Sequence, residues 1–213
     1  MSYDSEFVFF GIFLTVYIVI ILSSYLLHSF SVFAMSKKLN RPNAFLAFIP
    51  VASTYQFGAL AGEIKFEKKK IKNMGMIYLL STMGVGILAT VSFLIMFVSI
   101  AGTTFLTYSS YGQSDMTGIA AFLVSYMAFL LICIIGACFI NILTFLTVYK
   151  VYSMFYTNKF TPAVHAILSL FIPFYAEIFM LILSKRELTV EGAEEIKSAY
   201  PTYMPSYQPT PQG

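Results

Sequence analysis

One acidic residue stands inside an otherwise apolar stretch, and it is the strongest candidate for chemistry in this chain. Glu177 lies four residues after Pro173, among aromatic and aliphatic neighbours. A carboxylate placed in hydrocarbon costs about 3 kcal/mol by insertion scales and usually faces an interior partner. Lys150, His165 and His28 are the candidate partners. Glu177 is expected either to form an ion pair near the interface or to relay a proton or cation, with a pKa raised by desolvation.

Other polar residues follow Pro50 in a second apolar stretch. Ser53, Thr54 and Gln56 come directly after this proline, and hydroxyl groups there can satisfy carbonyls that the proline leaves without a partner. The same side chains are alternative candidates for lining a polar pathway. Asn141, in a third stretch, is expected to form a hydrogen bond between helices or to join that pathway.

The sequence contains no motif for catalysis or for a cofactor. There is no Gly-x-Ser-x-Gly, no His-Glu-x-x-His and no phosphate-binding glycine loop. His28 and His165 are isolated and do not specify a metal site. Cys133 and Cys138 would lie roughly 8 Å apart on one helix, beyond disulfide reach. We therefore predict a protein that is not an enzyme and that binds no cofactor or metal.

The composition of the whole chain indicates a membrane protein. The chain is 58% hydrophobic and 11% charged, against about 25% charged residues in a soluble domain. Residues 7–33, 74–100 and 118–148 contain no Asp, Glu, Lys or Arg, and each exceeds the roughly 20 residues that a helix needs to cross a bilayer. Residues 43–62 and 162–184 are shorter apolar stretches.

The distribution of charge predicts the topology. The N-terminus and residues 101–117 contain none of the 13 basic residues. If only the three clean stretches cross, every basic residue lies on one face, which the positive-inside rule makes cytoplasmic. We expect an all-α integral membrane protein with three full transmembrane helices, the N-terminus outside and the C-terminus in the cytoplasm. Five transmembrane helices are the alternative, since 20 to 23 residues just suffice to cross.

Both shorter stretches contain the tripeptide Phe-Ile-Pro, as Phe48-Ile49-Pro50 and Phe171-Ile172-Pro173. Proline disfavours a straight helix, and non-helical backbone at membrane depth must face protein or water. The stretches are therefore predicted to be two Pro-broken re-entrant or interfacial helical hairpins. Because each follows a long apolar stretch and a basic connector, residues 7–62 and 130–184 form a possible internal duplication.

Small residues in residues 74–100 and 118–148 predict that these two stretches pack closely as a hairpin. They include Gly84 and Gly86 in the first stretch and Gly136 in the second.

Residues 1–187 are predicted to form a single membrane domain and residues 188–213 a cytoplasmic tail. Residues 188–199 are polar and acidic and can form one short helix in spite of Gly192. The rest of the tail contains four prolines and is expected to be disordered from about residue 200.

A basic connector, residues 63–72, separates two apolar stretches. Its lysines are Lys65, Lys68, Lys69, Lys70 and Lys72. A run of lysines at this position favours binding to anionic lipid head groups. Nucleic-acid binding is not expected, because membrane topology already explains the charge.

The segment of residues 38–62 resembles part of a group of small bacterial multi-pass membrane proteins of unassigned function. Members have an Ile-Pro-x-x-Asn-x-Tyr-like pattern, and Ile49, Pro50 and Tyr55 match it, while Ser53 stands where the Asn would be. The resemblance implies a bacterial inner-membrane location and brings no reaction with it.

Three functions fit these features. The first is a non-enzymatic protein that assembles, anchors or modulates a membrane partner complex, as a homo-oligomer or with another membrane protein. The second is a small transporter or channel with a polar pathway near Glu177. The third is a membrane-curvature protein that acts through its hairpins.

Overall fold

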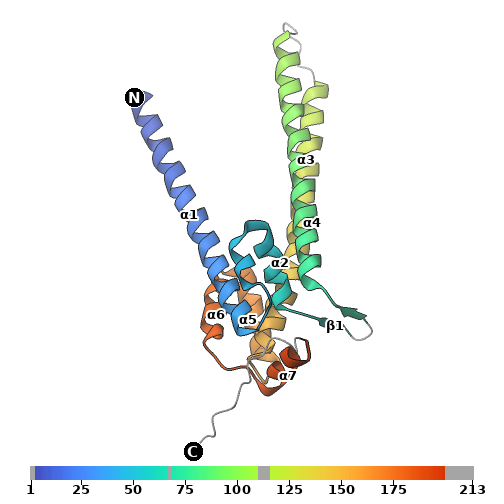
Figure 1. Cartoon of the computed structure of the whole chain (residues 1–213). Helices are drawn as coiled ribbons and strands as arrows, with labels where there is room; N and C mark the ends of the chain where they lie inside the picture. Colours follow the sequence, from blue (N-terminus) through green and yellow to red (C-terminus); the bar gives the residue numbers. More distant parts are fainter. Residues whose placement is uncertain (1–2, 67–68, 110–115, 200–213) are drawn as a thin grey trace, which may run out of the picture. The chain divides into compact units, whose positions relative to one another are not determined.

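The computed structural model describes residues 3–66, 69–109 and 116–199 (Figure 1). Within these ranges the chain is mostly helical, at 83%. Its elements, in order, are α1 (Tyr3–Lys38), η1 (Ala44–Phe48), α2 (Pro50–Leu60), β1 (Ile64–Phe66), β2 (Lys69–Ile71), α3 (Met74–Ser109), α4 (Met116–Ser153), α5 (Phe160–Phe171), α6 (Tyr175–Ser184) and α7 (Val190–Ala199). The disorder expected from about residue 200 lies outside the described residues.

Three of the described helices, α1, α3 and α4, are long and apolar enough to cross a membrane. The prediction of a mostly helical chain with three helices of membrane-crossing length is therefore confirmed. With 36 to 38 residues each, they are about 55 Å long and exceed the roughly 30 Å of a hydrocarbon core. By contrast, α2, α5 and α6 have 10 to 12 residues and are no more than about 18 Å long. None of these three short helices alone has the length to cross.

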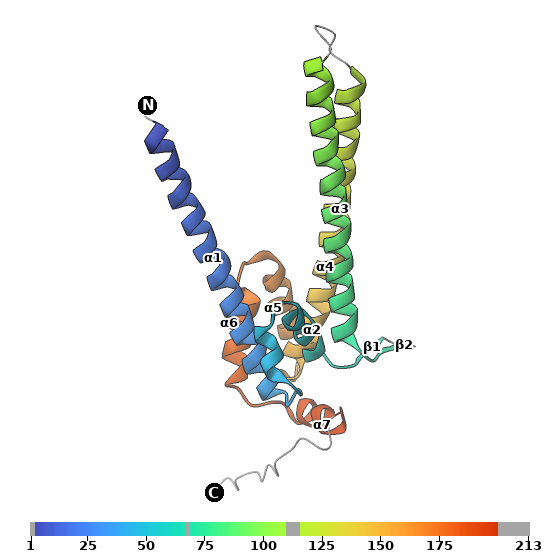
Figure 2. The same ribbon diagram turned by 45° about the horizontal axis from the view of Figure 1, so that its top comes forward.

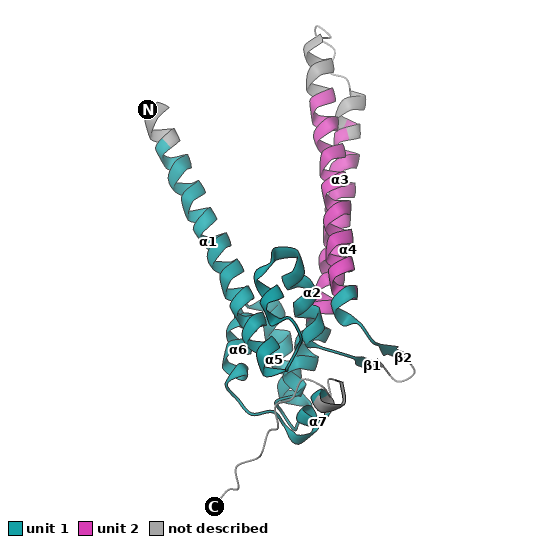
Figure 3. Ribbon diagram, viewed as in Figure 1, with its two compact units in different colours: residues 1–76, 145–213 teal, residues 77–144 magenta. Residues whose placement is uncertain are grey.

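The chain divides into two compact units, residues 1–76 with 145–213 and residues 77–144 (Figure 3). In the first unit, α1 contacts α6, η1 and α2, and α5 contacts α6. The C-terminal half of α1 supplies much of the core, since Val32 and Met35 are fully buried, and Met180 and Leu183 of α6 are buried as well. In the N-terminal half of α1, every residue from 8 to 22 is exposed. Figure 3 shows this half standing clear of the rest of its unit.

The backbone is interrupted at both Ile-Pro pairs in nearly the same conformation. Ile49 has φ −102° and ψ 120°, and Ile172 has φ −105° and ψ 115°. These are extended values, as expected for a residue before proline. Pro50 then opens α2 at its first position, where the missing N–H costs no hydrogen bond. After Pro173 the chain needs one more residue, Phe174 at φ 63°, before α6 begins.

An antiparallel strand pair lies in the basic connector, where no strand was predicted. Ile64 pairs with Ile71, Lys65 with Lys70 and Phe66 with Lys69. The expectation of an all-helical chain missed it because strands of three residues leave too short an alternating pattern to recognise.

The second unit is a helical hairpin in which α3 and α4 lie side by side (Figure 2). Paired contacts fix an antiparallel register along it. They are the hydrogen bonds Tyr78–Thr144 at 2.9 Å and Ser99–Ser125 at 3.2 Å, and the ring contact Phe93–Phe129 at 6.1 Å. The predicted hairpin is confirmed.

The tightest approach in this hairpin is at Gly136, where a Cβ would lie 2.5 Å from Cγ1 of Val85. The predicted seam was wrong at Gly84 and Gly86, because nothing lies within 4 Å of a Cβ at either position. Their neighbour Val85 faces α4 instead, since adjacent helix positions point in different directions.

The short helix predicted near the C-terminus is confirmed as α7, and it is attached to the end of α4. The Thr189 N–H and hydroxyl both donate to the Met154 carbonyl, at 3.0 and 2.9 Å. A Cβ at Gly192 would lie 2.5 Å from that same oxygen, and Ile196 is buried. Gly192, which weakens a helix on propensity alone, is thus required here by close backbone contact.

Candidate functional site

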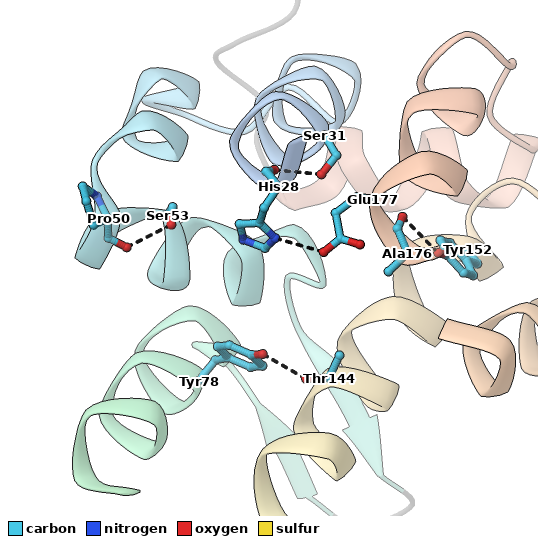
Figure 4. A network of polar contacts seen from close by, with 9 residues as sticks. All are labelled: His28, Ser31, Pro50, Ser53, Tyr78, Thr144, Tyr152, Ala176 and Glu177. Carbon is cyan, nitrogen blue, oxygen red and sulfur yellow. Dashed lines mark hydrogen bonds and ion pairs between the residues drawn. The ribbon is translucent and has the colours of Figure 1, made fainter. Parts of the chain in front are cut away.

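The candidate site lies in the first unit, where an acid from α6 meets a histidine from α1. Nδ1 of His28 and Oε1 of Glu177 are 3.3 Å apart (Figure 4). Both side chains are partly exposed, at 29% and 21%. The His28 ring also lies 5.6 Å from that of Phe57 on α2, and the Ser31 hydroxyl donates to the His28 carbonyl at 2.8 Å. Of the partners considered for Glu177, His28 is therefore found within hydrogen-bonding distance.

The electrostatics of Glu177 differ from those expected for a proton relay. Burial raises the pKa of its carboxyl, but the hydrogen bond with His28, its backbone N–H and the charge of His28 together lower that pKa below its ordinary value. The raised pKa expected of a proton or cation relay is therefore not found, because these contacts outweigh desolvation, whereas the ion pair that was the other expectation is present. The lowered pKa favours the ionised carboxylate, which suits an ion pair that joins α6 to α1.

Ser53 and Gln56 are buried and bonded within the protein. The Ser53 hydroxyl donates to the Pro50 carbonyl at 2.9 Å (Figure 4). Nε2 of Gln56 donates to the Ser36 hydroxyl at 3.0 Å and is 3.4 Å from the Pro42 carbonyl. These bonds fasten α2 and the loop before η1 to the end of α1.

The remaining predicted site residues are less engaged with this cluster. Thr54 is half-buried on α2, Pro50 and Pro173 are exposed, and Asn141 is exposed on α4. Asn141 belongs to the second unit, so the cluster described for the first unit does not include it.

Arg41 is a structural residue that sequence reasoning treated only as a topology charge. It is 7% exposed, and its Nη2 donates to the Leu60 carbonyl at 2.7 Å. A cation is favourable at the C-terminal end of a helix, here that of α2. Gly62, at φ 66°, leaves room for the guanidinium, because a Cβ there would lie 2.6 Å from Nη2. The position of Arg41 directly before Pro42, at a turn, is a weak signal for such a role.

A second cluster surrounds His165 on α5. Its ring stacks 4.1 Å from that of Phe179 and 6.0 Å from those of Tyr156 and Tyr175, and Nδ1 is hydrogen bonded to the Tyr175 hydroxyl. Burial and then the charge of Arg186 lower the pKa of His165, so it is neutral at physiological pH.

Tyr152, on α4, completes the cluster around His165. It is fully buried, and its hydroxyl donates to the Ala176 carbonyl at 3.4 Å (Figure 4). The ring meets that of Phe179 edge-on at 4.9 Å. The sequence signal for this cluster is the spacing of Tyr149, Tyr152 and Tyr156 at the end of α4.

The described residues include no group of three or more His, Cys, Asp or Glu side chains that could hold a metal ion. Comparison with models of protein families yields no match, and comparisons with curated proteins and with solved structures likewise find none. The resemblance of residues 38–62 to small bacterial membrane proteins stays a prediction.

Proposed function

We propose that this protein is a non-enzymatic, polytopic membrane protein that assembles, anchors or modulates a membrane partner complex. It lies in a bacterial inner membrane with its N-terminus outside and its C-terminus in the cytoplasm. α1, α3 and α4 cross the bilayer, and the two Ile-Pro breaks form hairpins that enter from the cytoplasmic side. The lysines of the connector, Lys65 to Lys72, lie against anionic lipid head groups.

The surface of the first unit supports the hairpin arrangement. Apolar side chains are exposed around both breaks, including Phe48, Ile49 and Val51 at the first and Phe171 and Ile172 at the second. Apolar groups at the break belong in hydrocarbon, while Lys159 and Lys185, which flank the second hairpin, belong at the head groups. A helix of about 18 Å matches the roughly 15 Å of one leaflet.

A pair of tryptophan probes tests this arrangement, because the chain has no Trp of its own. Phe160→Trp and Phe171→Trp mark the two ends of α5, which are 77% and 78% exposed and about 16 Å apart along the helix. In vesicles containing lipids brominated at defined depths, Phe171→Trp should be quenched deep in the leaflet and Phe160→Trp near the head groups. Equal depths would mean that α5 lies flat, and quenching of Phe160→Trp from the far leaflet would mean a spanning helix.

The observation that carries the partner proposal is the division of α1 into two halves. The C-terminal half is packed into the first unit, whereas the N-terminal half exposes a continuous apolar surface, with Phe9 at 74% and Phe13 at 63%. A helix held firmly at one end presents its other end to the membrane in a defined orientation. In lipid, association of such a surface with another helix is driven by packing, so a transmembrane partner or a second copy is the natural occupant.

Photo-crosslinking in native membranes tests that partner. A photoreactive phenylalanine at Phe9 or Phe13 should give one discrete protein adduct, identified by mass spectrometry as another membrane protein or a second copy. The same probe at Met35, which is 0% exposed, is the control and should give no adduct. Adducts with lipid alone from both exposed positions would refute the proposal.

A small transporter or channel is the second candidate function. The ionisable pair His28–Glu177 in the first unit favours it. It is less well supported, since Ser53 and Gln56 bond to the protein itself. Substrate- or proton-dependent flux in proteoliposomes that disappears in Glu177→Gln would establish transport, and equal flux in both proteins would exclude a role for this acid.

A further inference from the structure

The outer face of α5 carries a continuous apolar stripe. Phe160, Val164, Ile167 and Phe171 recur at helical spacing and are all exposed, from 37% to 78%. The opposite face, with Pro162 and Ala166, is buried in the first unit. Nothing in the described part of the first unit covers this stripe.

Helix α6 runs back along α5, so that the two outer ends of this helical hairpin lie together. His165 stacks on Phe179, and Arg186, just after α6, reaches Tyr156, just before α5. Nη1 of Arg186 donates to the Tyr156 hydroxyl at 3.3 Å, and its guanidinium carbon lies 5.8 Å from the ring centroid. These contacts are antiparallel, and they place the beginning of α5 beside the end of α6.

Three basic residues flank this open end, and we call them the basic mouth: Lys159 at the N-cap of α5, Lys185 at the C-cap of α6, and Arg186 directly after it. All three are exposed. Within the described residues no carboxylate lies within ion-pairing distance of any of them, although Glu187 is adjacent in sequence. Arg186 is held in place by Tyr156, and a pre-positioned guanidinium recognises phosphate oxygens well.

We propose that the basic mouth binds the head group of an anionic phospholipid whose acyl chains lie along the apolar stripe of α5. The charge of the mouth complements the phosphate, and the stripe begins at Phe160, directly beside Lys159. Its length of about 16 Å matches the depth of one leaflet. A free phosphate would use the mouth and leave the stripe unused, and an acidic peptide would find no further basic residues along the stripe.

This inference rests on the proposed hairpin topology for its setting in the cytoplasmic leaflet, but its test does not. Native mass spectrometry of the purified full-length protein in detergent, titrated with phosphatidylglycerol or phosphatidylcholine, measures lipid binding without reference to topology. The tryptophan pair measures topology without reference to lipid charge, so failure of one proposal is distinguishable from failure of the other.

The variant Lys159→Gln/Lys185→Gln/Arg186→Gln should weaken phosphatidylglycerol binding about 100-fold, since each basic residue near an anionic group contributes about fivefold. Lys159→Arg/Lys185→Arg keeps the charge and the Arg186 guanidinium and should bind as the wild type does, which guards against loss through misfolding.

Several outcomes would overturn the proposal. Equal binding of phosphatidylglycerol by the neutralised variant and the wild type would show that the basic mouth does not recognise the head group. Phosphatidylcholine bound as tightly would show that charge is irrelevant, and displacement by millimolar inorganic phosphate would identify a free-phosphate site. Competition by an acidic peptide, with no effect of acyl-chain length, would point to a protein partner instead.

Discussion

Replacing Gly136 by alanine should destabilise the α3–α4 hairpin, and the structure allows the size of the effect to be worked out. The new Cβ would lie 2.5 Å from Cγ1 of Val85, roughly 1 Å inside the usual carbon–carbon separation of about 3.5 Å. Overpacking of this kind costs about 1–3 kcal/mol. Alanine gains about 1 kcal/mol over glycine in helix propensity, so the net cost should be about 0–2 kcal/mol.

Comparing Gly136→Ala with Gly84→Ala cancels the contribution of helix propensity, because both variants replace a glycine in a helix by alanine. A Cβ at Gly84 meets nothing within 4 Å, so Gly84→Ala should be neutral or stabilising by up to about 1 kcal/mol. The two alanine variants should therefore differ by about 1–3 kcal/mol. Val85→Ala/Gly136→Ala should recover much of the loss, because it removes the methyl groups that the new Cβ meets.

The assay is the rate of disulfide formation between cysteines placed at Ser99 and Ser125, whose hydroxyl oxygens are 3.2 Å apart, in a background lacking Cys133 and Cys138. The rate is measured as SDS is added to mixed micelles. The Gly136→Ala hairpin should separate at a lower SDS fraction than the Gly84→Ala hairpin. Equal midpoints, or no rescue by Val85→Ala, would refute the packing argument.

Three further predictions concern the first unit. Gly192→Ala should detach α7, because its Cβ would lie 2.5 Å from the Met154 carbonyl oxygen; faster amide exchange across α7, with α5 unchanged, would show this, and unchanged exchange would contradict the docking. Gln56→Leu should cost about 1–3 kcal/mol, because the buried Ser36 hydroxyl loses its donor; an unaltered thermal midpoint would contradict the role of this bond. The lowered pKa of Glu177 stabilises the fold above the unfolded carboxyl pKa of about 4.3 and ceases to do so as pH falls through the folded value. The thermal midpoint should thus fall less on acidification in Glu177→Gln than in the wild type, and parallel curves would exclude this carboxyl as the cause.

The three long helices could be predicted from the composition of long stretches of the chain. Charge-free stretches of more than 20 residues leave few alternatives to helices of membrane-crossing length, and the boundary at Met74 was correct to the residue. The interruptions at Ile49-Pro50 and Ile172-Pro173 were also visible, because proline restricts both itself and the residue before it.

Features that depend on a distant partner were much harder to predict. The seam at Gly136 could not be separated from Gly84 and Gly86 by composition, since only the rotation of each helix decides which glycine faces its neighbour. The sign of the Glu177 pKa shift depends on His28, which is remote in sequence, and desolvation alone gave the opposite direction. Arg41 was counted as a topology charge, because its acceptor at Leu60 is a backbone carbonyl that carries no sequence signal.

The most direct test of the membrane arrangement is the accessibility of single cysteines at Lys70 and Lys72, both exposed, in a background without Cys133 and Cys138. A membrane-impermeant maleimide should label neither position in intact cells and both after permeabilisation, with a cysteine at Asp4 as the external control. Labelling of Lys70→Cys or Lys72→Cys from outside would place the connector on the opposite face, and would contradict the two cytoplasmic hairpins and the proposals that depend on them.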